Sequence, residues 1–292
     1  MAFSLQSFRK TLLYQAACTN AQIQAHLKQV ASQDQQAEKL SKQYGIWAAL
    51  SGVAAGLSLF GIETLPALWV LTLLLLVAMV VLIVLYSRQR RLNVADVRYQ
   101  LPGQLTQMLG RDMVKDAVFD VKIDFSSPTL KSKQTAKGPY PLRPGWKQAF
   151  FEDPWFCLRG EFLDGTEFTL LLNDLTVIRS GFKRSRSGKR KHKSKTKPKG
   201  TEAKLLLKFS RKKYGAIVLL KSSLDQAITL PREVEIKKIK VNDHQLWLEV
   251  KVPPHSPLLN QDSAVGLYRL FSQMLLSAYH ALNLSKALSK AA

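Results

Sequence analysis

The sequence predicts an α+β protein: a two-helix transmembrane hairpin, a cytoplasmic antiparallel β-rich domain and a C-terminal helix. Three observations lead to this prediction. Residues 43–87 carry a single formal charge, later segments alternate apolar and polar residues as half-buried strands do, and residues 262–286 repeat apolar positions at helical spacing. We therefore divide the chain into an amphipathic helical region at 1–44, the hairpin at 45–86, a helical linker at 87–110 and the cytoplasmic domain at 111–292.

The N-terminal region is rich in Gln and Ala. Its apolar residues recur at loose helical spacing, and neither Pro nor Gly occurs before Gly45. This pattern predicts one or two amphipathic helices that lead into the first span. Packing on the protein's own domain, self-association as a coiled coil and a location in the membrane interface are all open interpretations of its apolar face.

The low-charge stretch contains two apolar segments, Gly45–Ile62 and Pro66–Tyr86, joined by a turn that carries Glu63. The second segment would be about 31 Å long as a helix, close to the thickness of a bilayer core. A buried soluble hairpin is a poor alternative, because the chain offers no obvious shell for so many apolar side chains. A cleaved signal peptide would be shorter and would lie nearer the start.

Small residues follow one face of the first segment, where Ala48, Gly52 and Gly56 lie four residues apart. Such a stripe allows two helix backbones to approach closely in lipid. We expect it to pack within the hairpin. Packing between copies of the protein, or no special role, are the other interpretations.

Basic residues flank the hairpin on both outer sides: Lys39, Lys42, Arg88, Arg90 and Arg91. The turn between the segments carries only Glu63. The positive-inside rule then places both termini in the cytoplasm and the turn outside. The composition suits a protein of the bacterial inner membrane.

Alternating patterns and turn signals outline the domain. Residues 119–125 alternate strictly, Asp164-Gly165 and Asn242-Asp243 are hairpin turn signals, and Leu101-Pro102-Gly103 is expected to break or bend the linker helix. Residues 126–145 are expected to form a long loop, and 214–230 are ambiguous between strand and short helix. We expect six to eight strands in an antiparallel meander.

The net charge of +22 is concentrated in residues 181–200, which contain ten Lys or Arg and no acid. Charge repulsion and the lack of apolar residues predict a disordered or solvated excursion, at the tip of a long hairpin or in an inserted loop. The candidate polyanion-binding residues are Lys183, Arg184, Arg186, Lys189, Arg190, Lys191, Lys193, Lys195, Lys197 and Lys199.

Motifs for catalysis are missing from the sequence. There is no phosphate-binding loop, dinucleotide fingerprint, zinc-protease motif or nucleophile elbow. The five histidines lack metal-ligand spacing, and Cys18 and Cys157 have no partner motif. Carboxylates gather between Glu152 and Asp174, where we expect them to neutralise nearby Lys and Arg. We therefore predict no catalytic residues, metal or cofactor.

These observations favour a non-enzymatic, membrane-anchored adaptor or scaffold. Its basic tract would contact membrane lipid with anionic head groups or an acidic protein partner. A solvated loop that keeps the protein soluble and has no dedicated ligand is the other interpretation of this tract. The alternative is a membrane-tethered protein that binds nucleic acid, and a third reading is an enzyme with an unrecognised site. Membership of a homo-oligomer or of a larger membrane complex is compatible with all three.

Overall fold

The computed structural model describes residues 3–60, 68–184, 188–215, 217–220, 224–259 and 263–291. The chain divides into two compact units, one formed by residues 25–96 and the other by residues 1–24 with 97–292. The strands are β1 (Leu13–Thr19), β2 (Val118–Asp124), β3 (Gln134–Pro139), β4 (Lys147–Glu161), β5 (Glu167–Arg184), β6 (Arg190–Lys208), β7 (Glu235–Asn242) and β8 (Gln245–Val252). The α-helices are α1 (Leu5–Thr11), α2 (Asn20–Leu59), α3 (Leu68–Leu92), α4 (Val97–Leu109), α5 (Arg211–Tyr214), α6 (Leu224–Ala227) and α7 (Ser263–Ala291).

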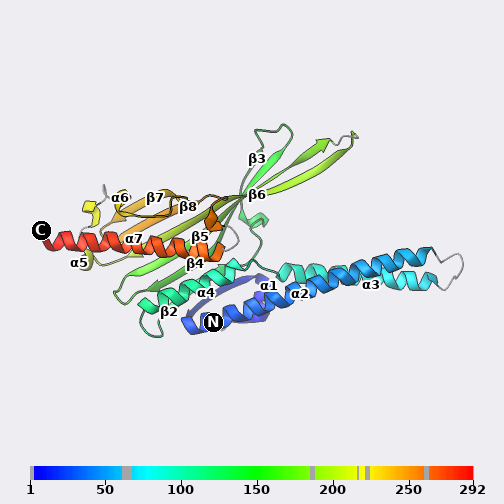
Figure 1. The fold of residues 1–292 in the computed structure, drawn as a ribbon, viewed down its shortest axis with the longest axis horizontal. Coiled ribbons are helices and arrows are strands. Elements are labelled where there is room, and N and C mark those ends of the chain that lie inside the picture. Colours follow the sequence, from blue (N-terminus) through cyan, green and yellow to red (C-terminus); the bar gives the residue numbers. More distant parts are fainter. Residues whose placement is uncertain are drawn as a thin grey trace. The chain divides into compact units, whose positions relative to one another are not determined.

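The larger unit is built on one antiparallel sheet with the strand order β1-β2-β4-β5-β6-β8-β7, and β3 pairs with β4 at the side. Helices α4 and α7 contact each other and lie on one face of this sheet (Figure 1). The predicted α+β class, with an antiparallel sheet and a C-terminal helix, is confirmed. The ambiguous residues 214–230 contain short helical turns rather than a strand.

The core forms where alternating strands meet the apolar stripe of the helices. On β2, Phe119, Val121 and Ile123 are at most 1% exposed, while the residues between them face outward. On α7, Phe271 and Met274 are fully buried. Burying a large apolar side chain contributes roughly 1.5–3 kcal/mol, so this shared interface stabilises both layers.

The N-terminal region differs from the helical prediction, which is wrong for residues 13–19. Leu12 adopts a left-handed conformation (φ 54°) that ends α1, and the chain continues as β1. Tyr14, Ala16 and Cys18 alternate as buried residues, and β1 pairs with the alternating strand β2. Pairing with a distant strand thus decides the structure of a segment whose composition also suits a helix.

The expected linker also contains a core element. Leu101, Leu105 and Leu109 on α4 are at most 2% exposed, so this helix belongs to the sheet-bearing unit. The helix was expected to break or bend at Leu101-Pro102-Gly103, and α4 continues through Pro102 without a break. A proline in the second turn removes a single i→i−4 hydrogen bond, and the burial of the three leucines offsets that loss.

The smaller unit is an antiparallel helical hairpin of α2 and α3. Ser58 Oγ and Thr72 Oγ1 are 2.7 Å apart, at the end of the hairpin where α2 ends and α3 begins. Further along, a Cβ at Gly52 would lie 3.1 Å from the Met79 sulfur. Ala48 is buried as well, but space is open around Gly56, and Ala55 is buried instead. The small-residue face therefore runs through Ala48, Gly52 and Ala55.

Among the described residues, one helical stretch is long and apolar enough to cross a membrane, and it begins at Leu68. The two-span hairpin is therefore not confirmed. The apolar half of α2 is rich in Gly, Ala and Ser, which contribute little hydropathy. The connecting turn with Glu63 lies outside the described residues.

Candidate polyanion-binding face

The basic tract forms regular strands. Pairing of β4 with β5 ends at Lys147 and Ser180, and pairing of β6 with β8 ends at Thr201. We call residues 175–184 and 188–200 the arm (Figure 1). Its residues 175–180 still pair with β4, and beyond Ser180 residues 181–184 and 190–193 continue as a free two-stranded ribbon. The predicted hairpin tip is present, and its described residues 188–199 are solvated as expected, but a backbone ladder orders them, so the alternative of a disordered excursion is wrong for these residues.

Strand pairing sorts the basic side chains onto two faces. Residues directly opposite in an antiparallel pair share a face, and the next pair lies on the other face. The pairs Lys183–Lys191, Gly181–Lys193, Arg179–Lys195 and Val177–Lys197 alternate with the pairs Arg184–Arg190 and Phe182–His192. We call the side that carries Lys183, Lys191, Lys193, Lys195 and Lys197 the cationic face.

The remaining predicted residues lie outside this row. Lys199 occupies a bulge, because Leu175 pairs with Gly200 and Thr176 with Pro198. Lys189 lies at the tip just before β6, and Arg186 falls within residues 185–187, which are outside the described part of the chain. Every described residue from 188 to 199 is exposed. The alternation of Lys with small polar residues therefore produces a straight row of solvated charges.

A tryptophan holds the loop between β3 and β4 against the arm. Trp146 lies over Gly181, where an added Cβ would be 2.6 Å from the indole ring. The indole Nε1 donates a hydrogen bond to the Phe182 carbonyl oxygen at 3.3 Å. The guanidinium of Arg143 stacks 4.4 Å from the indole centroid. This contact, which sequence reasoning missed, places one more cation beside the cationic face.

The arm and the segment beside it contain no acids of their own. Residues 126–151 contain five Lys or Arg and residues 175–201 contain eleven, and neither segment contains Asp or Glu. Of these cations, Lys133 is paired with carboxylates from outside both segments, Asp124 and Asp153. Alternate strand residues lie about 6.8 Å apart, so neighbouring charges on the cationic face repel by roughly 0.6 kcal/mol per pair in water. A bound polyanion would replace this repulsion by attraction.

A buried ionic cluster fixes the base of the arm. Asp153 is fully buried and accepts hydrogen bonds from Arg98 (2.5 Å) and Lys133 (2.7 Å). Lys133 also pairs with Asp124 at 2.8 Å. Burial acts to raise the pKa of Asp124, but hydrogen bonds from Lys133 and Ser126 hold that pKa below its ordinary value. The cluster joins α4, β2 and the start of β3 to the bulge of β4.

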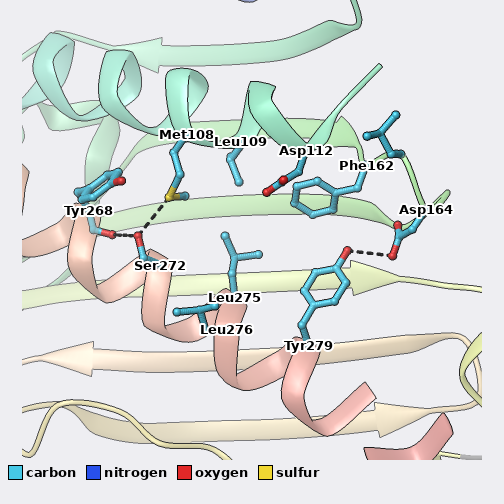
Figure 2. Close-up of a pocket in the computed structure, with 11 residues that line it drawn as sticks. Met108, Leu109, Asp112, Phe162, Asp164, Tyr268, Ser272, Leu275, Leu276 and Tyr279 are labelled. Atoms are coloured by element: carbon cyan, nitrogen blue, oxygen red, sulfur yellow. Dashed lines mark hydrogen bonds between the residues drawn. The ribbon is translucent and has the colours of Figure 1, made fainter. Parts of the chain in front are cut away.

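A separate apolar hollow of about 570 Å³ opens between α4, α7 and the β4–β5 turn (Figure 2). Its polar edge is Asp164, whose carboxylate accepts hydrogen bonds from Tyr214 and, at 3.3 Å, from Tyr279. Burial and the Asp164 carboxylate raise the pKa of Tyr214 to about 12, so it remains a donor at neutral pH. The hollow is lined by Met108, Leu109, Asp112, Phe162, Leu163, Asp164, Tyr268, Ser272, Leu275, Leu276 and Tyr279.

Asp164 and Ser272, two polar residues of the hollow, have further hydrogen-bond partners. Asp164 also accepts the backbone N–H of Thr166 at 2.8 Å, and Ser272 donates to the Tyr268 carbonyl at 2.9 Å. The sequence identified Asp164 as a turn residue and as one of the carboxylates gathered between Glu152 and Asp174, but not its tyrosine partners, because Tyr214 and Tyr279 are distant in the chain. The arrangement stabilises the turn and offers an apolar surface rather than an acid–base pair.

The other candidate groups have ordinary structural surroundings. Cys18 is buried, and burial raises the pKa of the Cys157 thiol, which disfavours the reactive thiolate. In the part of the chain that the structure describes, no three His, Cys, Asp or Glu side chains are grouped to hold a metal ion. Comparison with known protein families, curated proteins and solved structures finds no match.

Proposed function

We propose that this protein is a non-enzymatic, membrane-anchored adaptor that holds a polyanion on the cationic face of its arm. The observation that carries the proposal is the arm itself. Five lysines share one face of a paired ribbon, and residues 126–151 beside it contribute further cations and contain no Asp or Glu. Such a field concentrates anionic partners and accelerates their association.

A membrane anchor is supported by the exposure of the apolar helix. Only 6% of its most apolar window is buried within the structure, whereas the core helix of a soluble protein would be covered. The antiparallel contacts between α2 and α3 support a second span in the same hairpin. Lys and Arg flank the hairpin at both of its ends. By the positive-inside rule, we therefore propose that both termini lie in the cytoplasm of a bacterial cell.

Three classes of polyanion suit the arm: the head groups of anionic lipids, an acidic protein and a nucleic acid. Each lysine near an anionic membrane surface contributes about 1 kcal/mol. The release of condensed counterions makes a similar favourable contribution to the free energy of binding a nucleic acid. All three depend on the same side chains, so the adaptor role can be tested before the partner is known.

The test compares two variants of equal charge in the full-length protein in zwitterionic nanodiscs. One variant carries Lys→Ser at 191, 193, 195 and 197, and the control carries Lys→Ser at the exposed positions 10, 122, 238 and 240. On a heparin column we expect the arm variant to elute at clearly lower salt than the control. Equal elution of the two variants would exclude the arm as the binding surface.

The anchor is tested separately. In detergent-free lysate, the full-length protein should sediment with membranes and resist extraction by high salt and alkaline carbonate. Recovery in the supernatant after high-speed centrifugation would exclude the anchor while leaving the arm proposal intact.

A further inference from the structure

We infer that the polyanion is double-stranded DNA and that the tip of the arm enters its major groove. This inference rests on the proposed function and names the partner of the same site. It follows from the dimensions of the free ribbon, from the presence of cations on both its faces, and from the distribution of Arg and Lys along it.

The free part of the arm has the dimensions of a groove reader. Residues 181–184 and 190–193 pair with each other and, among the described strands, with no third strand. Four strand residues extend about 13 Å, and the two strands lie about 4.8 Å apart. The major groove of B-form DNA is about 12 Å wide and 8.5 Å deep and admits a two-stranded ribbon.

Both faces of the tip carry positive charge. Lys183 and Lys191 lie on the cationic face, and the directly paired Arg184 and Arg190 lie on the opposite face. A flat lipid surface meets one face of a ribbon and leaves the other in water. A groove offers phosphates along its sides and the O6 and N7 acceptors of guanine at its floor, so cations on both faces would find partners at once.

The arginines at the free end of the arm differ from the one nearer the sheet. Within the described two-stranded tip, Arg184 and Arg190 pair with each other beside Lys183 and Lys191. Nearer the sheet, Arg179 donates a hydrogen bond to the Tyr140 hydroxyl at 3.1 Å, and the row that leads back to the sheet consists of Lys193, Lys195 and Lys197. Arginine binds the O6 and N7 atoms of guanine in bidentate fashion, whereas lysine acts as a point charge toward phosphate. We therefore expect Arg184 and Arg190 to contact bases and the lysines of the cationic face to contact phosphates.

An aromatic pair accompanies the arginines. Phe182 is 63% exposed, and its ring lies 5.4 Å from that of His192 across the ribbon. An exposed apolar ring is unfavourable in water but can contact the thymine methyl group in the groove. The groove also selects B-form over A-form duplexes, because the major groove of A-form RNA is too deep and narrow for side chains to read.

The experiment measures binding of fluorescent 20-base-pair DNA to the full-length protein in zwitterionic nanodiscs by anisotropy. Five lysine–phosphate contacts predict a slope of log K against log salt of about −4.5, so affinity should fall roughly 500-fold between 50 and 200 mM salt. Lys→Ser at 191, 193, 195 and 197 should reduce this slope to about −1, and Lys→Ser at 10, 122, 238 and 240 should leave it unchanged.

Conservative tip variants separate base contact from charge. Arg184→Lys with Arg190→Lys retains both charges, so we expect the salt slope to stay the same while affinity for G-containing duplexes falls about tenfold or more. Phe182→Ser should weaken binding to duplexes with thymine. Simple charge attraction would make the arginine and lysine forms equivalent, and that result would overturn groove entry.

Parallel probes distinguish the partners. Single-stranded DNA, A-form RNA duplex and vesicles with 30% phosphatidylglycerol should each bind at least tenfold more weakly than duplex DNA. Stronger binding to any of these probes would overturn the DNA assignment and leave the adaptor proposal standing. Failure to bind every polyanion, including heparin, would exclude both.

Discussion

The buried pair of Arg98 and Asp153 gives the most direct test of how the arm is held. Asp153 is fully buried, and Arg98 also donates to the backbone carbonyl oxygens of Asp124 and Ser126. Replacing Arg98 by Met leaves the carboxylate with Lys133 as its remaining ionic partner. Breaking a buried ion pair costs about 3–5 kcal/mol. Because Lys133 stays in place, we expect about 3 kcal/mol.

The loss is measurable as a thermal shift. For a unit of about 200 residues, 1 kcal/mol corresponds to roughly 2–4 °C, so Arg98→Met should lower Tm by about 6–12 °C. Circular dichroism of the full-length protein in nanodiscs, followed in the β-sheet region, provides the assay. A matched control is Arg159→Met, because Arg159 pairs with Asp120 at 3.6 Å in an exposed position. Exposed pairs contribute at most about 1 kcal/mol.

We expect a larger Tm loss for Arg98→Met than for Arg159→Met. A Tm loss for Arg98→Met no larger than that for Arg159→Met would refute the view that burial makes this pair important. Asp153 pairs across the sheet with Asp174, the residue directly before the arm. The Arg98 variant should therefore loosen the base of the arm and also weaken heparin retention.

Three further perturbations test separate parts of the structure. Gly181→Ala places a methyl group against the Trp146 ring, so we expect altered tryptophan fluorescence, a loss of about 1–3 kcal/mol and weaker polyanion binding; unchanged fluorescence would contradict the contact. Burial raises the pKa of Asp174, so its ionised form destabilises the fold, and this penalty grows as pH rises from its unfolded pKa through its folded pKa. Asp174→Asn should therefore raise Tm at pH 7 and leave it nearly unchanged at pH 3, and a lower Tm at pH 7 would show the opposite sign. With cysteines introduced at positions 58 and 72, Gly52→Leu should reduce cross-linking between α2 and α3, whereas Gly56→Leu should have little effect because space is open there; equal effects would contradict the packing face.

Local patterns in the sequence were sufficient for much of the sheet. The alternation of residues 119–125 and the Asp164-Gly165 signal both depend on neighbours in the chain, and both appear in the structure as predicted. β1 was missed because its register is set by β2, about 100 residues later. A segment whose composition suits a helix becomes a strand when a partner strand is available.

Contacts between distant residues limit what the sequence reveals about the site. Arg98 and Asp153 are 55 residues apart, and their partnership depends on the placement of α4 against β4. The basic tract was visible as composition, but the division of its side chains between two faces required the register of β5 and β6. The alternation of Lys with His, Ser, Thr and Pro in 191–199 was the available signal, and it is a strand pattern that the high charge obscured.

The lysine row also has a consequence for solubility. Among the described strands, β6 pairs only with β5 from residue 190 to residue 200, so its outer edge presents free backbone groups. Exposed edges invite strand addition, and lysine on an edge opposes it. Edge protection and polyanion binding would both explain the row, and charge reversal separates them.

Replacing Lys191, Lys193, Lys195 and Lys197 by Thr removes the charge and raises strand propensity, so we expect concentration-dependent aggregation of the full-length protein in nanodiscs. Replacing the same four by Glu restores charge of the opposite sign. Repulsion between copies then returns, while attraction to polyanions is lost. Dynamic light scattering should show an aggregated Thr variant and a dispersed Glu variant, and heparin should retain the Glu variant weakly. If the Glu variant were retained like the unmodified protein, the row would serve only to protect the edge.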